Sequence, residues 1–134
     1  MQSAEEMIRT AREQRKLGNA DAAEASYEVA AALALIEGSA ERRAHALRHV
    51  AELAAARGQG NVALEAADEA VAIYASAEPD SLNLANAHRV RALAFATCGR
   101  SEDSQSDWRE ARKLYEQQGI EAGVAECDRR LKPD

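Results

Sequence analysis

Two histidines one helical turn apart, His45 and His49, have the residue type and spacing best suited to chemistry in this chain. In a helix this spacing places both imidazoles on one face, where they could chelate a metal ion, and Glu52 extends the same stripe. The residues between the histidines do not form an H-E-x-x-H motif, and Arg42 and Arg48 beside them disfavour a bound cation. We therefore expect two histidines on a binding surface, with a metal-binding or enzymatic protein that uses the His45/His49 stripe as the alternative.

No other group of residues points to catalysis. The sequence contains no glycine-rich phosphate loop, no G-x-S-x-G elbow and no nucleophile beside a base. Cys98 and Cys127 have neither the spacing of a zinc site nor that of a disulfide framework, so we expect both to be small buried side chains. His88 is expected to pack between helices. The sequence thus predicts a protein that is not an enzyme and needs no cofactor or metal.

The charge balance restricts the classes of partner. The chain has 134 residues and a net charge of -6, and an acidic protein is a poor general binder of nucleic acids or membranes. No apolar run approaches the roughly 20 residues that a membrane-spanning helix needs. The first residues lack the basic start and apolar stretch of a signal peptide. These observations predict a cytoplasmic protein that binds neither nucleic acid nor membrane.

The elements that position these side chains are expected to be helices throughout. Apolar residues make up 46% of the chain, alanine occurs 32 times, and only two prolines are present; alanine is the strongest helix former. Ser, Asn or Asp before a segment and Gly after it mark helix starts and stops. The helices predicted from these signals span 3–17, 20–37, 40–57, 61–77, 81–98, 102–118 and 121–131. The expected N-terminal caps are Ser3, Asn19, Ser39, Asn61, Asp80 or Ser81, and Ser101.

Internal repetition decides how these helices pack. Gly18, Gly58 and Gly99 lie 40 and 41 residues apart, and each is followed by the same pattern of side-chain sizes. The residues five, nine and twelve positions after each glycine are Ala23, Tyr27 and Ala30, then Ala63, Ala67 and Ala70, then Ser104, Trp108 and Ala111. A repeated helical unit cannot bury its apolar face alone, so we expect three units to stack. These units are 3–38, 39–78 and 80–119.

This pattern resembles the tetratricopeptide repeat (TPR), whose second helix carries alanine, an aromatic residue four positions on, and alanine three positions later. The period exceeds the usual repeat of about 34 residues, as in the kinesin-light-chain-like TPR subgroup, and HEAT-like repeats of about 40 residues are an alternative. Ala67 stands where an aromatic residue is usual. The resemblance implies an all-α domain over 1–134, folded as a right-handed solenoid of three helical hairpins. The helix at 121–131 is expected to cap its end.

Charge is segregated between the two helices of each unit. The three first helices together have a net charge of +5, whereas the three second helices together have -9. In the TPR family the first helices line a concave groove, so the resemblance implies a basic groove here. The residues expected to face it are Arg12, Arg15, Lys16, His45, Arg48, His49, Glu52, Asn86 and Arg89. The residue pattern of the chaperone-binding carboxylate clamp is not matched at these positions.

The segregated charge predicts a non-enzymatic protein-protein interaction module that binds an acidic or phosphorylated peptide in this groove. The simpler alternative is a solvated face without a ligand. Leu35 and Ile36 lie in the first unit, which no helix precedes, so we also expect a homo-oligomer formed through an open end or through the alanine-rich faces. Tyr74 and Tyr115 are expected to be half-exposed, where either could line a contact.

Overall fold

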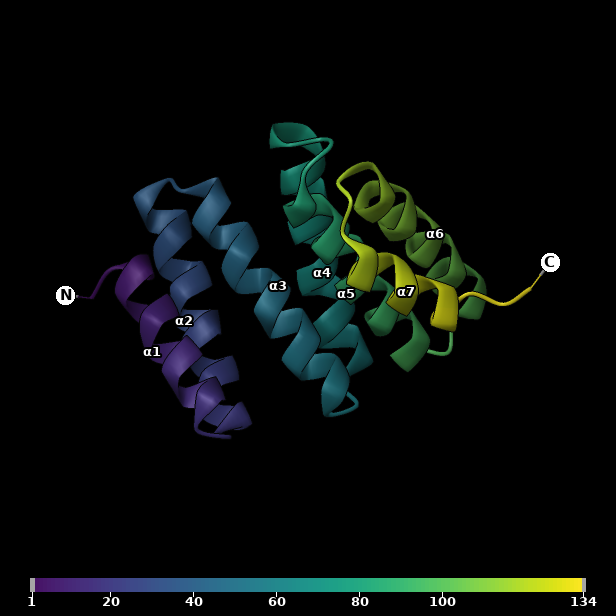
Figure 1. Cartoon of the computed structure of the whole chain (residues 1–134). Helices are drawn as coiled ribbons and strands as arrows, with labels where there is room; N and C mark the ends of the chain where they lie inside the picture. Colours follow the sequence, from purple (N-terminus) through teal and green to yellow (C-terminus); the bar gives the residue numbers. More distant parts are fainter. Residues whose placement is uncertain (1, 134) are drawn as a thin grey trace.

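The structure, a computed structural model, describes residues 2–133, and all regular elements in that range are helices. There are seven, arranged in a row from the N-terminal to the C-terminal end (Figure 1). Their bounds are α1 Ala4–Lys16, α2 Ala20–Glu37, α3 Ala40–Ala56, α4 Gly60–Ala77, α5 Leu82–Thr97, α6 Ser101–Gln117 and α7 Glu121–Arg130. Every bound lies within one residue of its predicted position.

Glycine ends most of the helices. Gly18, Gly38, Gly58, Gly99 and Gly119 all adopt positive φ angles, between 70° and 83°. A side chain would strain this left-handed conformation, whereas glycine enters it freely and lets the chain reverse within two or three residues. The recurring glycines therefore set the antiparallel course of consecutive helices.

The helix starts follow the prediction only in part. The hydroxyl groups of Ser3, Ser39 and Ser81 accept hydrogen bonds from the backbone N–H three residues on, at 3.0–3.3 Å, and so cap α1, α3 and α5. Asn19 occupies the N-cap position of α2 as predicted, but its side chain makes no capping hydrogen bond. The predicted caps of α4 and α6 are wrong, because Asn61 and Ser101 lie inside their helices. The residues before these three helices have ψ angles of 71–74° because they continue directly from the glycine turn.

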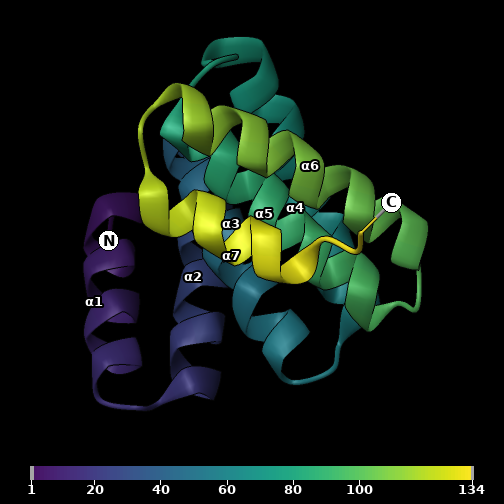
Figure 2. The same cartoon turned by 45° about the vertical axis from the view of Figure 1, so that its right-hand side comes forward.

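Each helix packs against its chain neighbour, so α1–α2, α3–α4 and α5–α6 form three helical pairs. Contacts of α2 with α3 and of α4 with α5 join successive pairs, and α1–α3 and α3–α5 contacts add to them. The helix α7 packs on α6, and Figure 2 shows it running alongside. In the described part of the chain α1 has no contact with α6, in keeping with their places at opposite ends of the row (Figure 1).

Alanine builds much of the core. The equivalent residues Ala30, Ala70 and Ala111 are completely buried, as the repeat pattern predicts, and Tyr27 and Trp108 fill space beside them. Small side chains let the helix backbones approach closely, while the aromatic rings occupy the gaps that alanine leaves. The repeat pattern therefore identifies the packing positions correctly.

Two tyrosines contradict the prediction. Tyr74 and Tyr115 are buried rather than half-exposed. Tyr74 packs into the cluster between the second and third pairs, and Tyr115 lies beneath α7. The approach of α7 is close because Gly123 has no side chain; a Cβ there would lie 2.5 Å from the Tyr115 ring. Cys127 is buried as predicted, whereas Cys98 is only partly buried.

Candidate binding site

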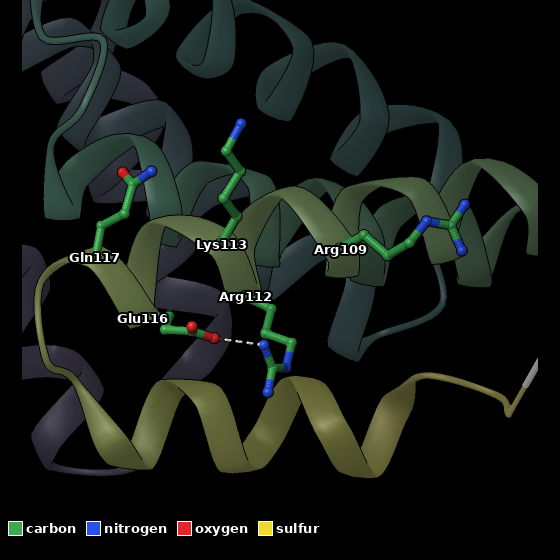
Figure 3. Close-up of a pocket in the computed structure, with 5 residues that line it drawn as sticks. All are labelled: Arg109, Arg112, Lys113, Glu116 and Gln117. Atoms are coloured by element: carbon green, nitrogen blue, oxygen red, sulfur yellow. Dashed lines mark hydrogen bonds and ion pairs between the residues drawn. The ribbon is translucent and has the colours of Figure 1, made fainter.

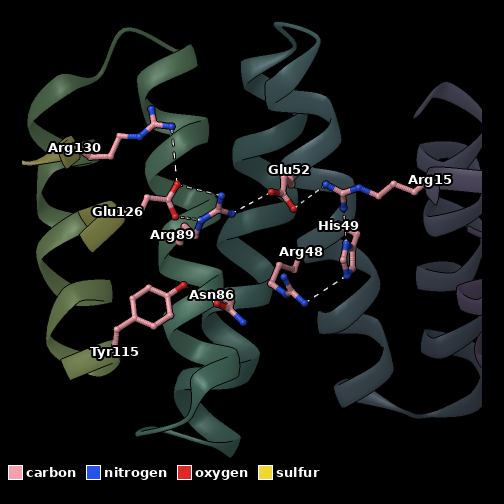
Figure 4. A network of polar contacts seen from close by, with 9 residues as sticks. All are labelled: Arg15, Arg48, His49, Glu52, Asn86, Arg89, Tyr115, Glu126 and Arg130. Carbon is pink, nitrogen blue, oxygen red and sulfur yellow. Dashed lines mark hydrogen bonds and ion pairs between the residues drawn. The ribbon is translucent and has the colours of Figure 1, made fainter. Parts of the chain in front are cut away.

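A chain of ion pairs crosses the four odd-numbered helices (Figure 4). Arg15 on α1 contacts Glu52 on α3 at 3.2 Å, and the other oxygen of Glu52 accepts a hydrogen bond from Arg89 on α5 at 3.1 Å. Arg89 also donates to Glu126 on α7 at 2.6 Å, and Arg130 lies 4.0 Å from that carboxylate. These contacts place α1, α3, α5 and α7 along one surface, which we call the odd-helix face.

The Glu52 carboxylate at the centre of this face stays charged. Burial alone would raise the pKa of Glu52, but hydrogen bonds and charge from Arg89 and Arg15 lower it below its usual value. Burial opposes the charge of Arg89 in the same way, and its bonds to Glu126 and Glu52 raise its pKa overall. Two of the predicted groove arginines, Arg15 and Arg89, are therefore paired with carboxylates of the same chain. The odd-helix face is less basic than the sum over its helices indicates.

The two histidines form a neutral cluster. The ring of His49 stacks on Tyr27 at 4.6 Å between centroids, and His45 approaches it edge-on at 4.8 Å. Burial and the nearby charge of Arg48 lower the pKa of His45 to about 4 and that of His49 to about 3. Both imidazoles are therefore uncharged at neutral pH, and the cations around them favour this neutral form.

Hydrogen-bond donors without acceptors meet beside His49. Its Nδ1 lies 2.9 Å from a guanidinium nitrogen of Arg15, which can only donate, so Nδ1 accepts and Nε2 carries the proton. Arg48 lies 3.4 Å from Nε2, a contact between two donors. The Nε atom of Arg48 is buried and has no hydrogen-bond partner. Among the side-chain N and O atoms of residues 2–133, it is the one buried atom without a partner. Asn86 uses its Oδ1 to accept from Tyr115 at 2.6 Å, which leaves its amide N–H groups as donors.

Figure 4 shows Arg48 between His49 and Asn86. We call these three residues the donor cluster. It combines one cation with N–H groups on two neutral side chains, and no carboxylate in the described chain pairs with Arg48. Such a set suits an oxyanion, because a carboxylate or phosphate oxygen can accept several N–H bonds at once. Arg12 and Lys16 lie exposed on α1 and form no ion pair in the described chain.

A hollow of about 490 Å³ lies on the same face, toward the C-terminal ends of α3 and α5. Its lining is mostly apolar and includes three charged side chains. The lining residues are Arg15, Glu52, Leu53, Ala55, Ala56, Leu93, Ala96, Thr97 and Arg130. The ion-pair chain separates this hollow from the donor cluster.

A second hollow, of about 440 Å³, lies on α6 and contains three cations (Figure 3). Its residues are Arg109, Arg112, Lys113, Glu116 and Gln117. They come from one helix, and Arg112 is already bonded to Glu116 and Asp128, each at 2.6 Å. This surface is therefore a solvated helix face, and it offers matched control positions for tests of the odd-helix face.

All nine predicted groove residues belong to the odd-numbered helices, and the structure brings six of them into direct polar contact or adjacency. These are Arg15, Arg48, His49, Glu52, Asn86 and Arg89. His45 packs on His49, while Arg12 and Lys16 stay at the exposed edge. In residues 2–133 no three His, Cys, Asp or Glu side chains gather to hold a metal ion.

Sequence reasoning missed Glu126, although a signal for it exists. Arg15, Glu52, Arg89 and Glu126 alternate in charge and follow one another at intervals of 37 residues. The interval is shorter than the repeat of 40 or 41, because contact positions on successive odd helices shift by about one helical turn. A search at this interval finds α7 as a fourth member of the face.

A scan against protein-family models finds no match for this chain, and a search of curated proteins finds no similar sequence. None of the helices in the described range has the length and apolar character to span a bilayer. Inferences about function therefore start from the geometry of the odd-helix face.

Proposed function

We propose that the protein is a non-enzymatic interaction module that binds an acidic or phosphorylated segment of a protein partner on its odd-helix face. The observation that supports this most strongly is the donor cluster. Arg48 pairs with no carboxylate of the described chain, and the N–H groups of His49 and Asn86 beside it also lack acceptors within the protein. The buried Nε of Arg48 is out of a partner's reach, so the other guanidinium nitrogens are the donors of this residue. An anionic group of a partner would supply those acceptors and would offset the cost of the partly buried cation.

The proposed architecture is a TPR-like, right-handed solenoid of three hairpins, with α7 covering its C-terminal end. Support comes from the recurring left-handed glycines and from the buried alanines at equivalent positions in α2, α4 and α6. In such a solenoid the odd helices form one continuous inner surface on which an extended segment can lie. The network residues are spaced along that surface.

Binding is expected to be weak and to depend on salt. A solvated ion pair contributes only about 0.2–1 kcal/mol, and salt screens it. Arg48 should contribute more, because it is partly buried and its planar guanidinium can bond two oxygens at once. Arg12 and Lys16 add long-range attraction at the edge of the face.

The test uses a library of fluorescent nine-residue peptides containing Glu, phosphoserine or neutral Gln at the central position. Fluorescence anisotropy measures binding to the full chain, to Arg48→Gln and to Arg109→Gln, which removes an exposed cation outside the face. We expect Glu or phosphoserine peptides to bind the parent and Arg109→Gln equally. Arg48→Gln should weaken them about tenfold. Equal binding by all three proteins would show that the odd-helix face is only a solvated surface.

We also propose that the chain self-associates through the outer face of α2. Ala22, Ala25, Val29, Ala32 and Ile36 form an exposed stripe with heptad spacing, and Ile36 is 82% exposed. The equivalent residues are Val62, Glu65, Glu69, Ala72 and Ser76 in α4, and Asp103, Ser106, Glu110, Lys113 and Gln117 in α6. Only α2 is apolar along this stripe. An apolar helix face can pair with its own copy about a two-fold axis.

A cytoplasmic location is part of the same proposal. Its support is that Cys98 and Cys127 are both free thiols, as is usual where the environment is reducing. Fractionation of the native cells with an antibody against the chain tests the location directly.

A further inference from the structure

We propose that the partner segment is extended and bipartite, with one acidic side chain at the donor cluster and one apolar side chain about three residues away in the hollow between α3 and α5. This inference rests on the proposed function and specifies the ligand of the same face. It joins two features that the binding proposal alone leaves unconnected: the oxyanion-binding donors and the apolar hollow of about 490 Å³.

The hollow suits one side chain rather than a second helix. Leu53 and Leu93 form its apolar base, while Ala56 and Ala96 are exposed at its opening. The short alanine side chains leave open space between α3 and α5 that a leucine or aromatic ring of a partner can fill. Filling it removes apolar surface from water on both molecules, which favours binding.

The separation of the two subsites follows from helix geometry. Arg48 precedes Ala55 on α3 by seven residues, and Asn86 precedes Leu93 on α5 by the same number. Seven residues of helix rise about 10 Å. A peptide in the extended polyproline II conformation covers about 3.1 Å per residue with three residues per turn, so its side chains three positions apart lie on the same side. Both odd helices therefore predict the same spacing, with two residues between the acidic and the apolar side chain.

The ion-pair chain lies between the subsites and restricts these two middle residues. Glu52 and Arg89 are already paired, so this part of the face presents little net charge. A carboxylate placed there would meet Glu52, and a lysine would meet Arg89. Small uncharged residues are therefore expected between the acidic and apolar positions.

The charge beside the hollow indicates that the occupant is part of an acidic partner. Arg130 lines the hollow and has only a long contact of 4.0 Å with Glu126, so its charge remains open to an acidic group of a partner. A second copy of this chain is a poor occupant, because its net charge of -6 is spread over whole helices rather than an extended segment. Flanking acidic residues beyond the apolar side chain should strengthen binding.

The experiment uses synthetic peptides in which Glu and Leu are separated by zero, two or five serines, in both chain directions. Isothermal titration calorimetry measures binding to the parent, to Ala96→Glu, which blocks the hollow, and to Ala72→Glu, which adds the same charge on the exposed face of α4. We expect the two-serine peptide to bind about tenfold more tightly than the others in one direction. Ala96→Glu should abolish that preference, and Ala72→Glu should leave it unchanged.

Two controls separate this inference from the binding proposal. Replacing Leu by Ser in the peptide should lower its affinity for the parent as much as Ala96→Glu lowers the affinity for the Leu peptide. Arg48→Gln should weaken the binding of every Glu-containing peptide by the same factor. If Arg48→Gln weakens binding but spacing has no effect, the bipartite segment is overturned and the acidic-partner proposal stands. If no peptide responds to Arg48→Gln, both are overturned. Circular dichroism melting confirms that each variant is folded.

Discussion

Glu126 occupies a place on the odd-helix face that an external carboxylate could also occupy. It accepts two hydrogen bonds from Arg89, at 2.6 and 3.3 Å, and lies on the helix that follows the three helical pairs. Arg89 thus has an internal ligand on one side and Glu52 on the other. Acidic segments that reach Arg89 must compete with a group fixed in the same chain.

Glu126→Gln should therefore strengthen the binding of acidic peptides while it weakens the fold. Loss of the carboxylate leaves Arg89 with one anionic partner, and affinity for a Glu peptide should rise about two- to fivefold. Loss of a partly buried ion pair should lower the free energy of unfolding by about 1–2 kcal/mol. The matched control is Asp128→Asn, which removes a carboxylate of α7 that bonds Arg112 away from the face. Peptide titration and urea unfolding measure both effects, and unchanged peptide affinity in Glu126→Gln would contradict the competition.

The neutral histidines make stability depend on pH. The pKa of His45 falls from 6.5 to about 4 on folding and that of His49 to about 3. Below pH 6.5 these histidines bind protons in the unfolded chain but stay neutral in the folded chain. The free energy of unfolding therefore falls as the pH falls. The expected slope is about 1.4 kcal/mol per pH unit for each histidine. Glu52, whose pKa is lowered, contributes only in more acidic solution.

Urea unfolding between pH 7 and pH 5 checks this dependence. The midpoint should move to lower urea concentration as the pH falls, and the double variant His45→Gln/His49→Gln should show a flatter profile. The comparison concerns the slope, because loss of the stack on Tyr27 lowers the stability of the variant at every pH. An identical slope in both proteins would assign the pH dependence to other groups.

Among whole elements, α7 is held in place by very few buried side chains. Cys127 is its one fully buried residue, and it packs against α6 where Gly123 meets the ring of Tyr115. This contact needs the absence of a side chain, although glycine is a poor residue inside a helix.

Gly123→Ala should destabilise the protein even though alanine favours the helix by about 1 kcal/mol. The added Cβ would lie 2.5 Å from the Tyr115 ring, so α7 must shift away from α6. We expect a net loss of about 1–3 kcal/mol, the usual scale of overpacking. Ala122→Gly on the exposed side of the same helix measures the propensity effect alone. Thermal melts of the two variants make the comparison, and a Gly123→Ala protein that melts above the parent would disprove the close contact.

The elements are more predictable from the sequence than the contacts between them. Helix bounds follow from alanine content and from glycine stops, which act within a few residues of chain. The burial of Tyr115 and the position of Glu126 depend instead on how α7 docks, and no local pattern contains that information. The donor cluster lies between these cases: its residues are predicted on one face, but the loss of Arg15 and Arg89 to internal ion pairs depends on the tilt between odd helices.

For the molecule as a whole, the two proposed interactions should respond to salt in opposite directions. Acidic peptides on the odd-helix face lose attraction as salt rises. The α2 stripe is apolar and is flanked by Asp21 and Glu28, while α2 contains no Lys or Arg. Two copies that meet there repel each other through these carboxylates, and salt screens the repulsion. Self-association should therefore strengthen with salt.

Sedimentation or light scattering at 0.05 M and 0.5 M NaCl measures this effect. We expect a larger average mass at the higher salt concentration and a monomer at both concentrations for Val29→Glu. Val62→Glu, at another exposed valine outside the α2 stripe, is the matched control and should behave as the parent. A parent that remains monomeric at every concentration tested would rule out pairing through α2.

Trp108, the one tryptophan of the chain, gives the molecule a built-in optical probe. It is buried in α6, and the guanidinium of Arg130 on α7 lies 5.4 Å from its ring centre. Departure of α7 would remove this cation and admit water, which should shift the emission of the indole to longer wavelength. Far-ultraviolet circular dichroism averages over all seven helices. In one thermal melt, fluorescence therefore follows the C-terminal end of the molecule, and circular dichroism follows the loss of helix as a whole. A fluorescence transition at a lower temperature than the dichroism transition would show that α7 is released before the rest of the molecule unfolds, without any added label.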